Sequence, residues 1–168
     1  MTSAEAVPVA HTPPGGYGAA LPAPILAGCA EPLVDGAPDL RGLWQVVAVV
    51  VDDAPAPADH PAYGTTQRIE QSGDRLVVTA AGVIHDMRCD GTEANGVNDV
   101  MQIDFTTKLT VVASYEHGVH VLRPKDMPGV EVTRARGGDQ MVWQYADAFI
   151  ARLDRIGDVD APHPEGDA

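Results

Sequence analysis

The chain has 168 residues, enough for one average domain with a single hydrophobic core. Its formal net charge is −13, from 24 acidic and 11 basic residues, and this excess argues against nonspecific binding to nucleic acid or to anionic membranes. No run of about eighteen apolar residues occurs, so no membrane-spanning helix is predicted. Two cysteines, Cys29 and Cys89, make no disulfide framework, and the expected location is the reducing cytoplasm.

Composition divides the chain into three segments. Residues 1–38 are rich in Ala, Pro and Gly, contain no Lys or Arg and show no hydrophobic period. Such a segment buries too little apolar surface to offset the entropy lost on ordering, so we expect a disordered leader. Residues 157–168 (GDVDAPHPEGDA) are expected to form a disordered acidic tail for the same reason. The folded domain is therefore expected at 39–156.

One tetrapeptide of the leader bears on location. The sequence from Leu26 to Cys29 resembles a bacterial lipobox, in which the cysteine is lipidated. A secretory signal also needs a basic start and a continuous apolar stretch. This leader has no positive charge, and Pro22 and Pro24 interrupt the stretch. We favour a chance match and leave open whether Cys29 is lipidated.

Most of the domain shows the period of two that is typical of half-buried strands. Gly and Asp between these segments supply the backbone conformations that hairpins need. Ala81-Gly82 is either a tight turn or a kink in one bent strand. About eight to ten short strands without a crossover predict an all-β, antiparallel, up-and-down barrel. The expected strands are 43–51, 65–71, 75–80, 83–89, 100–105, 108–116, 119–123, 130–136, 140–145 and 148–156.

The first and last expected strands carry a resemblance. A Gly-x-Trp ends at Trp44, and the last strand contains Arg152 and Arg155. Across residues 39–156 this pairing resembles the calycin superfamily of lipocalins and fatty-acid-binding proteins. The resemblance implies a lipocalin-like barrel in which Trp44 packs under Arg155 at the closed end, or under Arg152 if the strand slips by one. The later lipocalin motifs and the helical lid of fatty-acid-binding proteins are absent.

The resemblance extends to nitrobindin-like haem barrels, whose iron is held by a histidine near the C-terminus. After Val121 the first histidine is His163, in the tail. We therefore expect no haem, and no other cofactor is indicated.

A barrel of this size is wide enough to hold one small ligand. Alternation directs inward the side chains of several strands, and the Pro-rich loop 51–63 is expected to lie over the open mouth as a lid. The alternatives are that the inward residues simply fill a core and that the loop is an ordinary surface loop. The predicted ligand site consists of His60, Tyr63, His85, Met87, Tyr115, Trp143 and Tyr145.

Known catalytic and metal-binding motifs are missing from the sequence. It contains no nucleophile elbow, P-loop, dinucleotide fingerprint or HExxH. His117 and His120, with His85 as a third ligand, suggest a metal, but a Gly turn separates the first two and zinc needs three or four ligands. We expect no metal. Asp86 and Asp90 are expected to point outward as solvated charges.

Two functions fit these expectations. The first is binding of a small hydrophobic molecule inside the barrel. The alternative is a cofactor-free isomerase, cyclase or hydratase that acts on such a molecule through His85, Tyr115 or Tyr145. An interaction protein that uses its acidic tails is a weaker third possibility. The sequence does not indicate an oligomeric state.

Overall fold

The computed structural model describes residues 2–160. Its strands are β1 (Gly42–Val51), β2 (Ala54–Pro55), β3 (Thr66–Ser72), β4 (Arg75–Ala80), β5 (Val83–Arg88), β6 (Val97–Val100), β7 (Lys108–Glu116), β8 (Val119–Pro124), β9 (Val132–Gly137), β10 (Gln140–Tyr145) and β11 (Phe149–Gly157). The helical segment is a single 3-10 turn, η1 (Ala4–Ala6). Within the described residues, no helix has the length and apolar character needed to cross a membrane.

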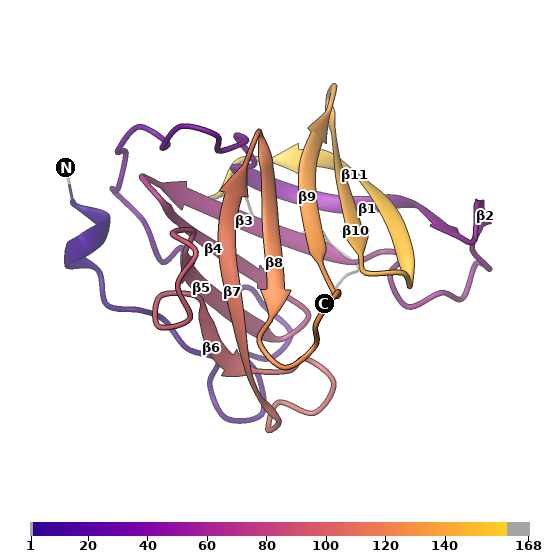
Figure 1. The fold of residues 1–168 in the computed structure, drawn as a ribbon, viewed down its shortest axis with the longest axis horizontal. Helices are drawn as coiled ribbons and strands as arrows, with labels where there is room; N and C mark the ends of the chain where they lie inside the picture. Colours follow the sequence, from indigo (N-terminus) through magenta and orange to yellow (C-terminus); the bar gives the residue numbers. More distant parts are fainter. Residues whose placement is uncertain (1, 161–168) are drawn as a thin grey trace.

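The strands form one antiparallel sheet that curls into a nearly closed barrel (Figure 1). The strand order is β5-β4-β3-β1-β11-β10-β9-β8-β7-β6, and the short β2 pairs only with β1. Consecutive hairpins make up each half of this order, and the pairing of β1 with β11 joins the halves. The prediction of an all-β, up-and-down antiparallel barrel is confirmed.

The tight turn at Ala81-Gly82 fixes which side chains face inward. Both residues have positive φ, 50° and 88°, and Ala80 pairs with Val83 across the turn. Two consecutive positive φ angles are typical of a two-residue hairpin turn. The turn is therefore not a kink, and its register places His85 opposite Val78 on the inner face.

The prediction of a strand at 100–105 is wrong, because β6 ends at Val100. The Asp104 carboxylate accepts hydrogen bonds from the amides of Thr106 and Thr107, at 2.9 and 2.8 Å. This local capture of backbone N–H groups favours a turn over a strand. Ile103 is 81% exposed as a result. The alternation of Met101, Ile103 and Phe105 imitates a strand without forming one.

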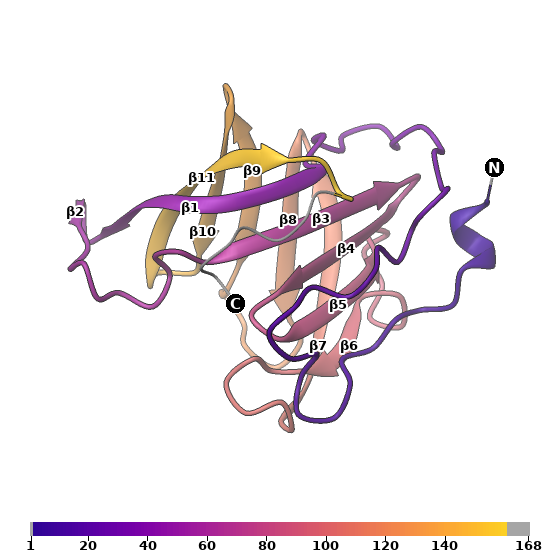
Figure 2. The same ribbon diagram turned by 180° about the vertical axis from the view of Figure 1, so that it is seen from behind.

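The leader lies against the barrel, which its composition did not predict. It runs along the outer face of β5 and β4, turns beside the β4–β5 hairpin, and returns along β3 (Figure 2). The Tyr17 amide donates to the Gly82 carbonyl at 3.0 Å, and the Leu26 amide donates to Glu70 at 2.8 Å. Charged side chains of the sheet thus supply hydrogen-bond partners that composition alone does not show. The expected tail lies mostly at 161–168, outside the described residues, together with His163.

A seam remains where β5 and β6 stand at the two ends of the strand order. Across it, the His85 ring lies 3.0 Å from the Val100 carbonyl. Thr12 of the leader also bridges the seam. Its hydroxyl accepts from the Ile84 amide at 2.9 Å, and its own amide donates to Asp99 at 3.0 Å. The leader therefore joins the two edges of the barrel.

The closed end departs from the expected Trp–Arg pair. Trp44 and Arg155 are partners in the ladder, as the resemblance implied. However, the Arg155 side chain donates to the Arg41 carbonyl at 3.0 Å and crosses Gly42, where a Cβ would lie 2.5 Å from its Nε. The guanidinium that covers the Trp44 ring belongs to Arg136 of β9, 5.3 Å from the ring centroid. The expectation that Arg155 or Arg152 covers Trp44 is wrong.

Candidate functional site

The interior contains a polar cluster embedded in an apolar core. Arg134 on β9 is opposite both His120 on β8 and Trp143 on β10, so three neighbouring strands present these side chains at one level. Gln67 on β3 reaches the same cluster from across the barrel. All four residues are buried, and Arg134 is only 5% exposed.

Arg134 is a buried cation without a matching anion. Its Nε donates to Oε1 of Gln67 at 3.2 Å, and its guanidinium lies 5.5 Å from the Trp143 ring centroid. No carboxylate of residues 2–160 pairs with it, and its Nη1 has no hydrogen-bond partner there. Burial lowers the pKa of Arg134 to about 10, so it is still charged at neutral pH. A buried, unpaired charge is costly unless another group compensates it.

His120 and Trp143 add unused hydrogen-bonding capacity. Both ring nitrogens of His120 and the Nε1 of Trp143 have no partner among the described residues. Burial, and secondarily the charge of Arg134, lower the pKa of His120 well below its usual range. The imidazole is therefore neutral at pH 7 and offers one donor and one acceptor. With Arg134, the cluster can donate several hydrogen bonds to one acceptor group.

An aromatic cluster leads from this polar site to the open end. Phe149 on β11 contacts Trp143 edge-on at 5.1 Å between centroids and stacks on Tyr145 at 5.3 Å. His60, from the loop between β2 and β3, contacts Phe149 edge-on at 5.2 Å. Tyr145 is 40% exposed at the rim. The cluster of ring contacts extends from the exposed Tyr145 to the buried Trp143.

A pocket of about 450 Å³ opens beside this rim. Its lining includes Tyr63, Phe105, the Gly82 turn and Tyr17 of the leader. The Tyr63 hydroxyl lies 3.4 and 3.3 Å from the carbonyls of Val49 and Ala56, which fixes the loop against β1. A second pocket, of about 420 Å³, lies between the leader and the β3–β4 turn. Neither pocket is the interior pocket expected from the sequence.

The structure brings together part of the predicted site. Trp143, Tyr145 and His60 meet around Phe149, and Tyr63 lies in the neighbouring pocket. Met87 is buried in the core. The predicted residues therefore gather mainly at the open end.

The three proposed catalytic residues occupy different regions of the barrel. His85 lies at the seam, where burial lowers its pKa. Tyr115 lies near the closed end of β7, where its hydroxyl accepts from Gln71 at 2.9 Å and burial raises its pKa. Tyr145 lies at the open rim. This separation supports no common catalytic arrangement.

Sequence reasoning missed Arg134, His120, Gln67 and Phe149 as site residues. The signal for Arg134 was present, because it follows Val132 at a spacing of two and shares its inward face. His120 precedes the inward Leu122 in the same way. A basic residue at an inward strand position is the feature that could have identified this site.

The three histidines considered as metal ligands were His85, His117 and His120. His117 lies in an exposed turn, whereas His120 is buried inside the barrel. Within residues 2–160, no group of three His, Cys, Asp or Glu side chains is placed to hold a metal ion.

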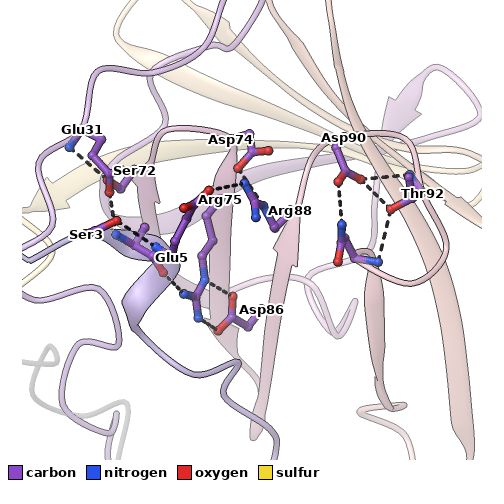
Figure 3. Close-up of polar contacts among 12 residues, drawn as sticks. Ser3, Glu5, Glu31, Ser72, Asp74, Arg75, Asp86, Arg88, Asp90 and Thr92 are labelled. Atoms are coloured by element: carbon purple, nitrogen blue, oxygen red, sulfur yellow. Dashed lines mark hydrogen bonds and ion pairs between the residues drawn. The ribbon is translucent and has the colours of Figure 1, made fainter.

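The two outward carboxylates behave differently (Figure 3). Asp90 is exposed and accepts hydrogen bonds from Thr92 and Asn95 of its own loop. Asp86 was expected to be solvated but is 4% exposed, because the leader covers it. It forms two hydrogen bonds with the Arg75 guanidinium, at 2.8 and 2.5 Å. The expectation of a solvated Asp86 is therefore wrong.

No protein-family model matches the sequence, and no curated protein is significantly similar to it. Among solved structures, the barrel resembles human cRBP IV, a cellular retinol-binding protein, with a TM-score of 0.51. The match covers 70% of this chain and 98% of that chain at 13% sequence identity. The strand order and this likeness show that the chain has the fold of a lipocalin-like, up-and-down β-barrel.

Proposed function

We propose that the barrel interior binds one small, largely apolar molecule through an oxygen-bearing group that meets Arg134. The observation that carries this proposal is the buried guanidinium of Arg134, whose Nη1 has no partner within residues 2–160. A carboxylate suits it best, because a carboxylate supplies the missing negative charge and accepts hydrogen bonds in the planar geometry of a guanidinium.

The surroundings of Arg134 support the same ligand chemistry. The neutral His120 imidazole and the Trp143 indole provide further donors at the same level of the barrel. The aromatic surfaces of Trp143, Phe149 and Tyr145 suit the apolar part of the ligand. The likeness to human cRBP IV supports small-ligand binding in general.

A cytoplasmic location belongs to this proposal. It rests on the cysteine content, because a chain with two cysteines and no disulfide framework suits a reducing compartment. Burial raises the pKa of Cys89 to about 12, which keeps it protonated and unreactive.

The first test is native mass spectrometry of the protein purified from its own host, followed by identification of any bound molecule. The second is titration with a fluorescent apolar probe that carries a carboxylate, compared with its methyl ester. We expect one site per chain and tighter binding of the acid. Arg134→Gln should weaken binding of the acid about tenfold or more, because a charge-assisted hydrogen bond is lost.

The matched control is Arg152→Gln, which removes an exposed arginine from β11. It should leave both probes unaffected. Equal loss of the acid and the ester in Arg134→Gln would show that Arg134 is structural. Failure of both probes to bind the parent protein would remove the interior site altogether.

A further inference from the structure

The outer face of β3, β4 and β5 is unusual for a barrel because charged side chains are buried on it. Arg68, Glu70, Arg75 and Asp86 point away from the interior and yet are almost completely covered. What covers them is the leader, which makes hydrogen bonds to each. Lys, Glu, Arg and Asp are almost never fully buried unless they are paired.

These side chains bind main-chain groups of the leader. Arg75 donates to the carbonyl oxygens of Ala4 and Val7, both at 2.6 Å, and to that of Pro8 at 3.0 Å. Its partner Asp86 holds the guanidinium in place. Asp86 also accepts a hydrogen bond from a leader amide, that of Ala10, at 2.9 Å.

The returning half of the leader is held in the same way. Glu70 accepts from the amides of Leu26 and Ile25, at 2.8 and 3.1 Å. Arg68 donates to the carbonyl of Pro22 at 2.5 Å. Every polypeptide carries such carbonyls and amides, so these contacts recognise the path of a backbone. In the leader this path includes the 3-10 turn Ala4–Ala6 and a second turn at residues 25–28.

A small apolar contact adds sequence preference. The leader residues Ala4 and Leu26 are buried against Val77 and Ile84 of the sheet. This cluster is separate from the interior core, whose first residue along the chain is Leu40. The leader up to residue 31 can therefore detach without removing any residue from the interior core. Detachment would return the charged side chains to water, so it would leave none of them buried and unpaired.

From these contacts we propose that the outer face of β3–β5 is a binding site for a polypeptide segment, and that residues 2–31 of this chain are its exchangeable occupant. The partner that the site fits is a Pro- and Ala-rich segment that can adopt the two turns of the leader, with free carbonyls for Arg75 and one aliphatic anchor at the position of Leu26. The interior ligand site is not required for this proposal.

The experiment uses the full chain with a protease site inserted between Asp35 and Gly36, an exposed turn. After cleavage, we expect the leader fragment to stay bound through gel filtration. An excess of fluorescent synthetic peptide with the sequence of residues 2–31 should replace it. Both tryptophans belong to the barrel, so an unchanged emission spectrum and circular dichroism will show that the barrel stays folded during exchange.

Peptide variants test recognition without altering the barrel. N-methylation of the Leu26 amide removes the donor to Glu70, and Leu26→Asp removes the aliphatic anchor. Each should weaken binding about tenfold or more, whereas Ala20→Ser, at an exposed position, should have no effect. Arg75→Gln in the barrel should release the fragment more readily, whereas Arg123→Gln, at an exposed position of β8, should not.

Three results would overturn the proposal. The fragment could leave a folded barrel that takes up no peptide at any concentration. The barrel could unfold when the fragment leaves, which would make the leader an inseparable part of the fold. Finally, the N-methylated and Leu26→Asp peptides could bind as well as the parent peptide, which would show that these contacts do not select the occupant.

Discussion

The guanidinium of Arg136 covers the indole ring of Trp44 at 5.3 Å and closes the narrow end of the barrel. Trp44 is completely buried, and its Nε1 donates to the Leu40 carbonyl at 2.8 Å. We expect Trp44→Ala to lower the free energy of unfolding by about 3–5 kcal/mol, as for other large buried aromatic residues. Urea denaturation provides the measurement.

The same assay tests the contact between Arg136 and Trp44. Arg136→Gln should lose about 1 kcal/mol, because it removes the cation–π contact and a hydrogen bond to the Asp39 carbonyl. Arg152→Gln serves as the exposed control. If Arg136→Gln matches that control, the contact with Trp44 contributes nothing measurable to stability.

Arg134 should stabilise a complex and destabilise the empty barrel. Since its charge is buried without an anion, Arg134→Met should raise the free energy of unfolding of the ligand-free protein by about 1–4 kcal/mol. The same variant should lose binding of the carboxylate probe. A loss of stability in the ligand-free variant would show that Gln67 and Trp143 already compensate the charge.

Stability should fall below neutral pH because of His120. In the unfolded chain a histidine titrates near pH 6.5, whereas burial lowers the pKa of His120 well below that in the barrel. The unfolded state therefore binds the proton more tightly. The contribution of His120 is complete above about pH 6.5 and is lost as the pH falls toward its folded-state pKa, by about 1.4 kcal/mol per pH unit.

Two variants isolate this effect. His120→Phe should flatten the decline in stability between about pH 6.5 and pH 5, measured by urea denaturation. His117→Gln, at an exposed turn, should follow the parent protein. His85 also has a lowered pKa and contributes in the same direction, so only the difference between parent and variant reports on His120.

The seam should open when its bridge is removed. Thr12→Val deletes the hydroxyl that accepts from the Ile84 amide. We expect faster hydrogen exchange at that amide, about tenfold or more, because a typical hydrogen bond contributes about 1 kcal/mol or more. Exchange at amides of β10, in the middle of the sheet, should not change. Equal protection of Ile84 in the two proteins would show that the leader does not hold the seam.

The sequence by itself determined the barrel. Strand periodicity and turn formation are local properties, because each depends on residues that are neighbours in the chain. The period of two and the turn residues Gly73, Gly118 and Gly138 therefore located most strands and their inward faces. It also placed Trp44 opposite Arg155 in the ladder. The sequence left the register of β5 open, because a shift by one residue exchanges the two faces of a strand. The turn at Ala81-Gly82 settled this register.

Only the tertiary structure decided where the charged side chains find their partners. Arg75 donates hydrogen bonds to backbone carbonyls that are far away in the chain, and the carbonyl of Ala4 is 71 residues from it. Arg134 meets Gln67 at a separation of 67, and Arg136 takes the place expected for Arg155 over Trp44. Local periodicity tells which face a residue occupies. It does not tell which distant segment covers that face, because this depends on how the whole chain closes.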